Sequence, residues 1–144
     1  MAITSAICNS FKQEILEAEH NFTASSGDTF NLALYDSDAT LNKSTTAYTT
    51  SEELATTGGY TAKGKALTSV TPVLDSDTAV CDFANTSWTS ASFTARGCLI
   101  FNDDHASDAS VCAIDFGGDK TVTSGTFTVE FPAAAASTAI IQIA

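Results

Sequence analysis

The chain has 144 residues, which fits a single folded domain over 1–144, and its 44% hydrophobic content excludes wholesale disorder. Its net charge of −11, from 17 acidic residues against 6 lysines and arginines, argues against nucleic acid and membranes as partners. The 22 threonines and 16 serines suit half-buried strands and turns, so the composition predicts a mainly β protein.

One short helix is predicted near the start of the chain, over about residues 10–20. Ser10 is its expected N-cap, and Gln13 completes a capping box three residues later. We expect His20 to end the helix. We also expect its apolar face to pack against a sheet, with contact to a partner subunit as the alternative. Spacings of three and four define this face, which consists of Cys8, Phe11, Ile15, Ala18 and Phe22.

Short strands are predicted for most of the remaining chain. Apolar and polar residues alternate with a period of two and are interrupted by Gly, Asp and Asn clusters, which indicates antiparallel sheet. In the first strand Phe30, Leu32 and Leu34 share one face. Trp88 is expected to plug one end of the core, and residues 117–119, Gly-Gly-Asp, are expected to turn the chain. The predicted strands are 29–35, 66–74, 78–83, 93–101, 111–116, 127–131 and 139–144.

A long segment rich in Ser, Thr and Asp, residues 36–57, follows the first strand, with Leu41, Tyr48 and Leu54 as its apolar anchors. Long loops in compact domains tend to be functional or ordered by a partner. The isoleucines of the last predicted strand are also exposed unless something covers them. We therefore predict that the chain forms a homo-oligomer or joins a larger shell.

Catalytic groups are scarce in the sequence. The chain has two histidines, and His105 lies in an acidic turn where it is expected to be solvated. No Gly-x-Ser-x-Gly elbow, phosphate-binding loop, dinucleotide motif or zinc spacing is present. We therefore predict no enzyme activity and no cofactor.

Carboxylates gather at three places in the sequence, and calcium prefers several such oxygens. None of the three matches the EF-hand spacing, and aspartate is favoured in turns because its side chain bonds to the local backbone. We predict no metal, with calcium as the alternative. The three places are Asp36 with Asp38, Asp75 with Asp77, and Asp103 with Asp104 and Asp108.

The four cysteines form no CxxC pair. Residues 1–8 have no basic segment and only a short apolar one, so no secretion signal is predicted and we expect synthesis in a cytosol. The thiols at Cys8, Cys81, Cys98 and Cys112 are therefore expected to be reduced and mostly buried. Cys98 and Cys112, on neighbouring predicted strands, are the expected pair if a disulfide forms.

Motifs spread over nearly the whole chain carry a family resemblance. They are Cys8-Asn9-Ser10-Phe11-Lys12-Gln13-Glu14, Gly27-Asp28-Thr29-Phe30, Leu32-Ala33-Leu34-Tyr35, Ala47-Tyr48-Thr49-Thr50, Gly59-Tyr60-Thr61-Ala62, Trp88, Thr94-Ala95-Arg96-Gly97, Asp115-Phe116-Gly117, Asp119-Lys120 and Phe131-Pro132. These stretches resemble small virion proteins of tailed bacteriophages, of the capsid decoration or cement type. Lys63 departs from the family pattern, which has glycine there. The resemblance implies an antiparallel β-sandwich, jelly-roll-like in topology, to which the residues add one short N-terminal α-helix.

The resemblance also implies a role on the capsid exterior, in a protein made in the bacterial host cytoplasm. We expect a decoration protein, a homotrimer that binds the major capsid protein and stabilises the shell by bridging capsomers. The alternatives are a tail or neck structural protein and, from another class, a host-glycan-binding domain with Trp88 as its aromatic platform. The expected subunit or capsid contacts are Phe11, Ile15, Leu41, Tyr48 and Leu54.

Overall fold

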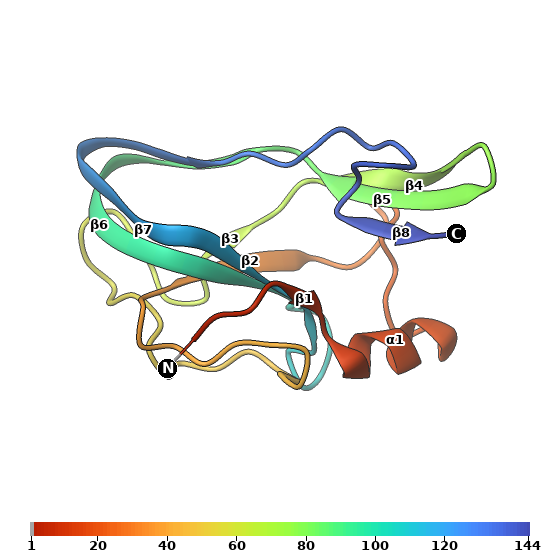
Figure 1. Cartoon of the computed structure of the whole chain (residues 1–144), viewed down its shortest axis with the longest axis horizontal. Helices are drawn as coiled ribbons and strands as arrows, with labels where there is room; N and C mark the ends of the chain where they lie inside the picture. Colours follow the sequence, from red (N-terminus) through yellow and green to blue (C-terminus); the bar gives the residue numbers. More distant parts are fainter. Residues whose placement is uncertain (1) are drawn as a thin grey trace.

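Two antiparallel sheets and one short helix make up the computed structural model, which describes residues 2–144 (Figure 1). The larger sheet has the strand order β1-β7-β6-β2-β3 and the smaller one the order β4-β5-β8. The elements are β1 (Ala6–Ile7), α1 (Asn9–Leu16), β2 (Phe30–Tyr35), β3 (Lys65–Ala66), β4 (Ser69–Asp75), β5 (Thr78–Phe83), β6 (Thr86–Asn102), β7 (Ser110–Val129) and β8 (Ile141–Ile143). The prediction of a mainly β, antiparallel fold with one short helix is confirmed. The sheets are consistent with a β-sandwich, whereas the jelly-roll prediction is not confirmed.

One long hairpin, β6 and β7, joins the two layers of the molecule. Its pairing runs from Thr86 opposite Val129 to Phe101 opposite Ser110. In Figure 1 the two strands run side by side through the lower layer, bend at the left of the view, and return through the upper layer toward β4 and β5. The ladder therefore contributes to both faces of the core.

The predicted turn at residues 117–119 is wrong, because these residues lie inside β7. Between the pairs Ala95–Lys120 and Gly97–Asp115, β6 has the single residue Arg96 whereas β7 has residues 116–119. The extra residues form a bulge in β7. Gly117 has a φ of 80°, a left-handed conformation that glycine adopts without penalty. The two glycines thus lie in a bulge within β7 and not in a turn between two strands.

The core surrounds β2, whose six residues are all buried. Phe30, Leu32 and Leu34 belong to the main apolar cluster, as the alternation predicts, and Ala33 and Tyr35 belong to a second, smaller cluster. Trp88 lies in the main cluster. The four cysteines are buried, as expected, and are free within the described residues, whereas their reduced state stays a prediction. No helix among residues 2–144 is long and apolar enough to cross a bilayer.

The helix is shorter than predicted at its C-terminal end. It covers Asn9–Leu16, and its N-cap is Cys8, not Ser10. Cys8 is extended because its N–H donates to the Val111 carbonyl of β7 at 2.9 Å, so the helix starts directly after this strand contact. At the other end Ala18 takes a φ of 60°, and the Glu19 N–H bonds back to the Glu14 carbonyl at 3.0 Å. His20 therefore follows the closing turn and is not part of the helix.

Candidate functional site

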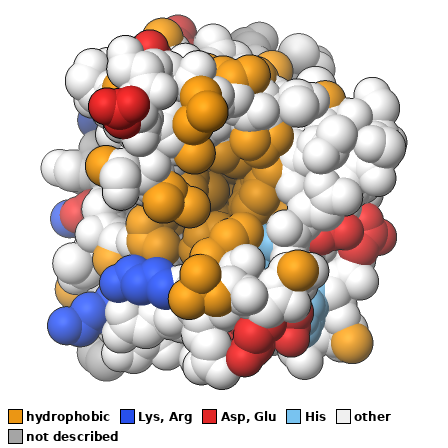
Figure 2. All heavy atoms as spheres, turned by 90° about the vertical axis from the view of Figure 1, so that its right-hand side faces the viewer, with side chains coloured by type: hydrophobic (Ala, Val, Ile, Leu, Met, Phe, Trp, Pro, Cys, Tyr) orange, Lys and Arg blue, Asp and Glu red, His pale blue; other side chains and the backbone are white. Residues whose placement is uncertain are grey.

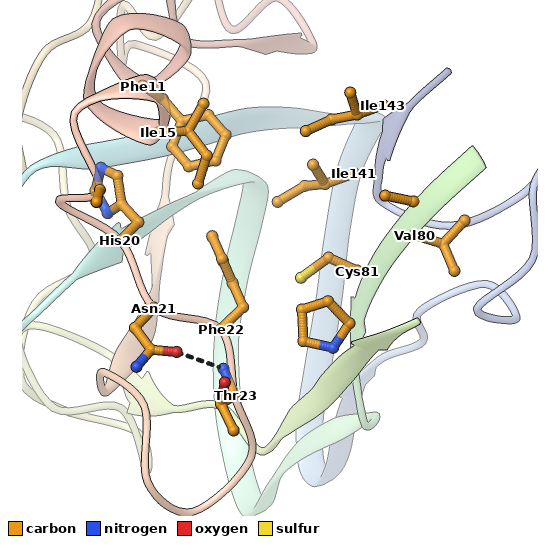
Figure 3. A pocket seen from close by; sticks show the side chains of 13 residues that line it. Phe11, Ile15, His20, Asn21, Phe22, Thr23, Val80, Cys81, Ile141 and Ile143 are labelled. Atoms are coloured by element: carbon orange, nitrogen blue, oxygen red, sulfur yellow. Dashed lines mark hydrogen bonds between the residues drawn. The ribbon is translucent and has the colours of Figure 1, made fainter. Parts of the chain in front are cut away.

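An apolar groove of about 470 Å³ opens between α1 and the small sheet β4-β5-β8, and we call it the α1–β8 groove. Figure 2 shows hydrophobic side chains gathered in a hollow on this face of the molecule. Figure 3 shows the two walls, with side chains from α1 and the segment after it on one side and from β5 and β8 on the other. Its principal lining residues are Phe11, Ile15, Phe22, Cys81, Ile141 and Ile143.

The sheet wall of the groove continues beyond the core into solvent. Ala79 of β5 pairs with Leu74 on one side and with Ile143 on the other, so the three side chains form a row across one face. The next row inward, Cys81 with Ile141, is buried. Leu74 is 75% exposed and Ile143 57% exposed, which leaves the outer row uncovered.

The helix wall of the groove is anchored by aromatic packing. The ring of Phe11 is buried, with its centroid 5.9 Å from that of Phe22 and 5.0 Å from that of His20. Ile15 packs against the core from the same helix and is partly exposed. Leu16, which follows it, is 88% exposed. The lining of the groove is thus mainly apolar.

His20, at the edge of the groove, is buried and held by hydrogen bonds on both ring nitrogens. The Asn102 amide donates to Nδ1 at 3.1 Å, so the proton lies on Nε2, which is 2.7 Å from the Glu14 carboxylate. His105 stacks on this ring with a centroid distance of 5.9 Å. It was expected to be solvated, yet it is half-buried and its Nε2 lies 2.7 Å from the Glu19 carboxylate. This cluster fastens the turn after α1 to the end of β6.

The sequence offered no signal for this cluster, because the residues after α1 and their partners at and after the end of β6 are separated by 82 to 86 positions. With Nδ1 of His105 also accepting the Ser107 N–H at 3.1 Å, both rings have their nitrogens engaged within the chain. The arrangement therefore links the segment after α1 to the end of β6 and the turn that follows it.

The predicted contact loop, residues 36–57, is fastened to the body by a carboxylate. Glu53 accepts hydrogen bonds from the hydroxyls of Tyr48 at 2.5 Å and Tyr60 at 2.7 Å. The Tyr60 oxygen in turn accepts the N–H of Leu34 in β2 at 3.0 Å. Burial, together with the hydrogen bond to Glu53, raises the pKa of Tyr48 to about 12.

The structure brings two of the five expected contact residues to the groove, namely Phe11 and Ile15. Leu41 is buried in the second apolar cluster, and Tyr48 packs against that cluster with its ring 4.8 Å from the Phe101 ring. Leu54 packs against the main core. The loop side chains therefore hold the loop in place, and their role as contacts to another protein stays a prediction.

Lys63 takes a left-handed conformation, with a φ of 69°. That conformation suits glycine better than a residue with a side chain. The lysine side chain bridges two carboxylates, with Nζ 2.9 Å from Asp103 and 3.0 Å from Asp108. Hydrogen bonds to these carboxylates raise the pKa of Lys63 to about 12.

Cation ligands gather at one point on the surface among the described residues. Oxygens of Asp36, Asp38 and Glu52 lie within 4.8 Å of one another and could hold an ion. The backbone N–H of Asp38 already bonds to the Asp36 carboxylate at 2.9 Å, as in an ordinary aspartate turn. Carboxylates at the other two predicted places contact groups of the chain itself. Lys63 pairs with Asp103, and the Ala136 N–H donates to Asp75 at 2.7 Å.

Comparisons of the chain with models of protein families, with curated proteins and with solved structures find no match.

Proposed function

We propose that this chain is a structural protein of a tailed-bacteriophage virion, a decoration or cement protein bound to the outer surface of the capsid. The observation that carries the proposal is the α1–β8 groove, which is lined mainly by apolar residues and continues into a cross-strand row in which Leu74 and Ile143 are exposed. An apolar surface of this kind is a characteristic protein-contact site. The resemblance of the chain's motifs to small virion proteins supplies the context in which we place that contact.

In this proposal the protein stabilises the shell by burying apolar surface at its joints. Each large aliphatic side chain taken out of water contributes about 2 kcal/mol, so a few such residues per joint, repeated over a capsid, resist outward pressure. The major capsid protein is the proposed partner, with a homotrimer as the proposed assembly. The net charge of −11 suits the outside of the shell, where the protein does not meet the packaged DNA.

The proposal assigns no reaction to the chain. The titratable side chains that the fold brings together, such as His20 with Glu14 and Tyr60 with Glu53, join one segment to another. These contacts stabilise the loop and the turn after the helix. A host-glycan role loses its aromatic platform, because Trp88 is only 4% exposed and packs among Tyr60, Phe93 and Phe127.

Copy number in the virion tests the proposal. Purified virions that contain this chain are digested and the chain is quantified against the major capsid protein by mass spectrometry with isotope-labelled peptides. A decoration protein is expected in hundreds of copies, in a fixed ratio to the capsid protein, and labelled antibodies should bind over the whole shell. A handful of copies at one vertex or along the tail would assign the chain to the neck or tail instead.

A further inference from the structure

We propose that the α1–β8 groove binds an extended, apolar segment of another protein that carries lysine or arginine at its ends, and that this segment pairs with the free edge of β8. The inference deepens the proposed function, on which it rests, by specifying the chemistry of the partner segment. Three features of the groove carry it, namely the strand edge, the apolar volume and the charge around the rim.

The first feature is the strand edge. In the part of the chain that the structure describes, β8 pairs with β5 alone and is the outer strand of the small sheet. One row of its backbone N–H and C=O groups therefore has no strand partner. Such an edge accepts an added strand, in which main-chain hydrogen bonds supply affinity. Figure 3 shows that Ile141 and Ile143 point from this edge into the groove.

The second feature is the apolar volume beside that edge. In an added strand every second side chain points to the same face, so alternate residues would enter the groove. Its volume of about 470 Å³ falls within the usual range for binding pockets, roughly 300–1,000 Å³, and its lining is mainly apolar. The incoming residues should therefore be aliphatic or aromatic at alternate positions, with Phe11 and Ile15 as their contacts on the helix wall.

The third feature is the charge around the rim. Acidic residues flank the lining of the groove in the sequence, with Glu14, Glu17 and Glu19 next to the lining residues Ile15, Ala18 and His20. Asp75 and Asp77 stand at the tip of the β4–β5 hairpin. Lys12 is the one lysine or arginine among residues 9–29, and β4, β5 and β8 contain none.

This charge selects the occupant. A second copy of the chain would bring its own net charge of −11 to an acidic rim, and like charges at an interface oppose binding. Lysine or arginine at the ends of a partner segment would instead meet the carboxylates of the rim. The geometry therefore favours a different protein, with a cationic, apolar segment, over self-association.

Binding of a synthetic peptide to the whole chain tests the proposal. The probe is a short fluorescent peptide that alternates valine and threonine and has two lysines at each end, followed by fluorescence anisotropy. A matched peptide with glutamates at the ends keeps the apolar part and reverses the charge. We expect the lysine peptide to bind at least tenfold more tightly, with an affinity that falls as salt is raised. Equal binding of the two peptides, or no binding of either, overturns the proposal.

Two substitutions locate the bound peptide. Ile143→Ser removes an apolar contact of the groove and should weaken binding about tenfold. Val73→Ser is the matched control, because Val73 is 52% exposed in the same sheet and does not line the groove. Leu74→Ser, at a more exposed position in the same cross-strand row as Ile143, gives a second variant whose fold should be unaffected. Thermal melting checks each variant, and equal weakening by Ser at 73 and at 143 overturns the site.

Sedimentation of the chain alone tests whether a second copy of the chain, and not a different protein, occupies the groove. If the chain self-associates and Ile143→Ser abolishes that association, a second copy is the occupant and the proposal is wrong. Amide exchange in the complex should show new protection in β8, and unchanged exchange there would refute the added strand. Peptide binding does not depend on where the chain lies in a virion, so failure of the copy-number test would leave this result intact.

Discussion

The carboxylate of Glu53 accepts a hydrogen bond from the hydroxyl of Tyr60 at 2.7 Å, and this contact joins the long loop to the central strand. The Tyr60 oxygen also accepts the N–H of Leu34, a buried residue of β2. The second carboxylate oxygen accepts the hydroxyl of Tyr48. Glu53 is thus one of the residues that fasten a segment with only isolated bridges and no strand of its own.

We expect Glu53→Gln to destabilise the chain by about 2 kcal/mol, because hydrogen bonds to a charged acceptor are stronger than those to an amide. Urea unfolding followed by tryptophan fluorescence measures the change. Glu52→Gln is the matched control, since Glu52 is the exposed neighbour, and it should change stability by no more than about 0.5 kcal/mol. Equal effects of the two substitutions would show that the carboxylate of Glu53 does not hold the loop.

The strands that show a local alternation of apolar and polar residues are predicted well from the sequence. β2 and β5 appear within a residue of their predicted bounds, because the period of two and the flanking turn residues are both local signals. The helix end was missed because Ala18, and not glycine, takes the left-handed position after Glu17. The bulge at residues 116–119 was missed because Gly-Gly-Asp suits a turn and a bulge equally.

The groove lies at the limit of what sequence can predict. The apolar stripe of the helix and the isoleucines of the last strand are both legible, and the need to cover them was predicted. Their meeting was not, since Ile15 and Ile143 lie 128 positions apart in the sequence and only the tertiary fold brings them to one cavity. The bonds of Glu53 and His20 depend on the fold in the same way.

Lys63 is expected to respond to substitution through its backbone as well as its charge. Lys63→Ala loses the contacts to Asp103 and Asp108 and keeps a side chain at a φ of 69°. Lys63→Gly loses the same contacts but relieves the backbone, so it should be more stable than the alanine variant by about 1 kcal/mol. The difference should persist in 1 M salt, because it does not arise from charge. Thermal melting at both salt concentrations measures it, and an alanine variant as stable as the glycine variant would contradict the backbone account.

Asp82 is expected to make the protein less stable as the pH rises. Its side chain is buried, and among the described residues its Oδ2 has no hydrogen-bond partner. Burial raises the pKa of this carboxyl above its usual range in the folded state. The folded chain therefore holds the proton more tightly than the unfolded chain, and the stability this supplies at low pH is lost as the pH rises through the unfolded and folded pKa values. Asp82→Asn should raise the melting temperature at pH 7 and have little effect near pH 3.

Asp115 is expected to give the opposite dependence of stability on pH, and it serves as the control for Asp82. The Arg96 guanidinium lies 3.0 Å from its carboxylate and, with the Gly117 N–H, lowers the pKa of Asp115. Its contribution is present at neutral pH and is lost as the pH falls through the usual and then the lowered pKa. Asp115→Asn should therefore lower the melting temperature at pH 7, with the difference from the natural chain shrinking in acid. A common pH dependence for the two variants would show that neither carboxyl behaves as its surroundings indicate.

Substitution of Phe11 tests whether its side chain stabilises the fold or contacts a partner. The side chain is buried against Phe22 and His20, so Phe11→Ala should cost about 3 kcal/mol of folding free energy through the cavity that it leaves. Leu16→Ala is the matched control in the same helix, because Leu16 is exposed and its loss should leave stability within about 0.5 kcal/mol. Urea midpoints measure both. If Phe11→Ala were as stable as the natural chain, the ring would not be part of the core, and its expected role would move from the fold to the contact with a partner.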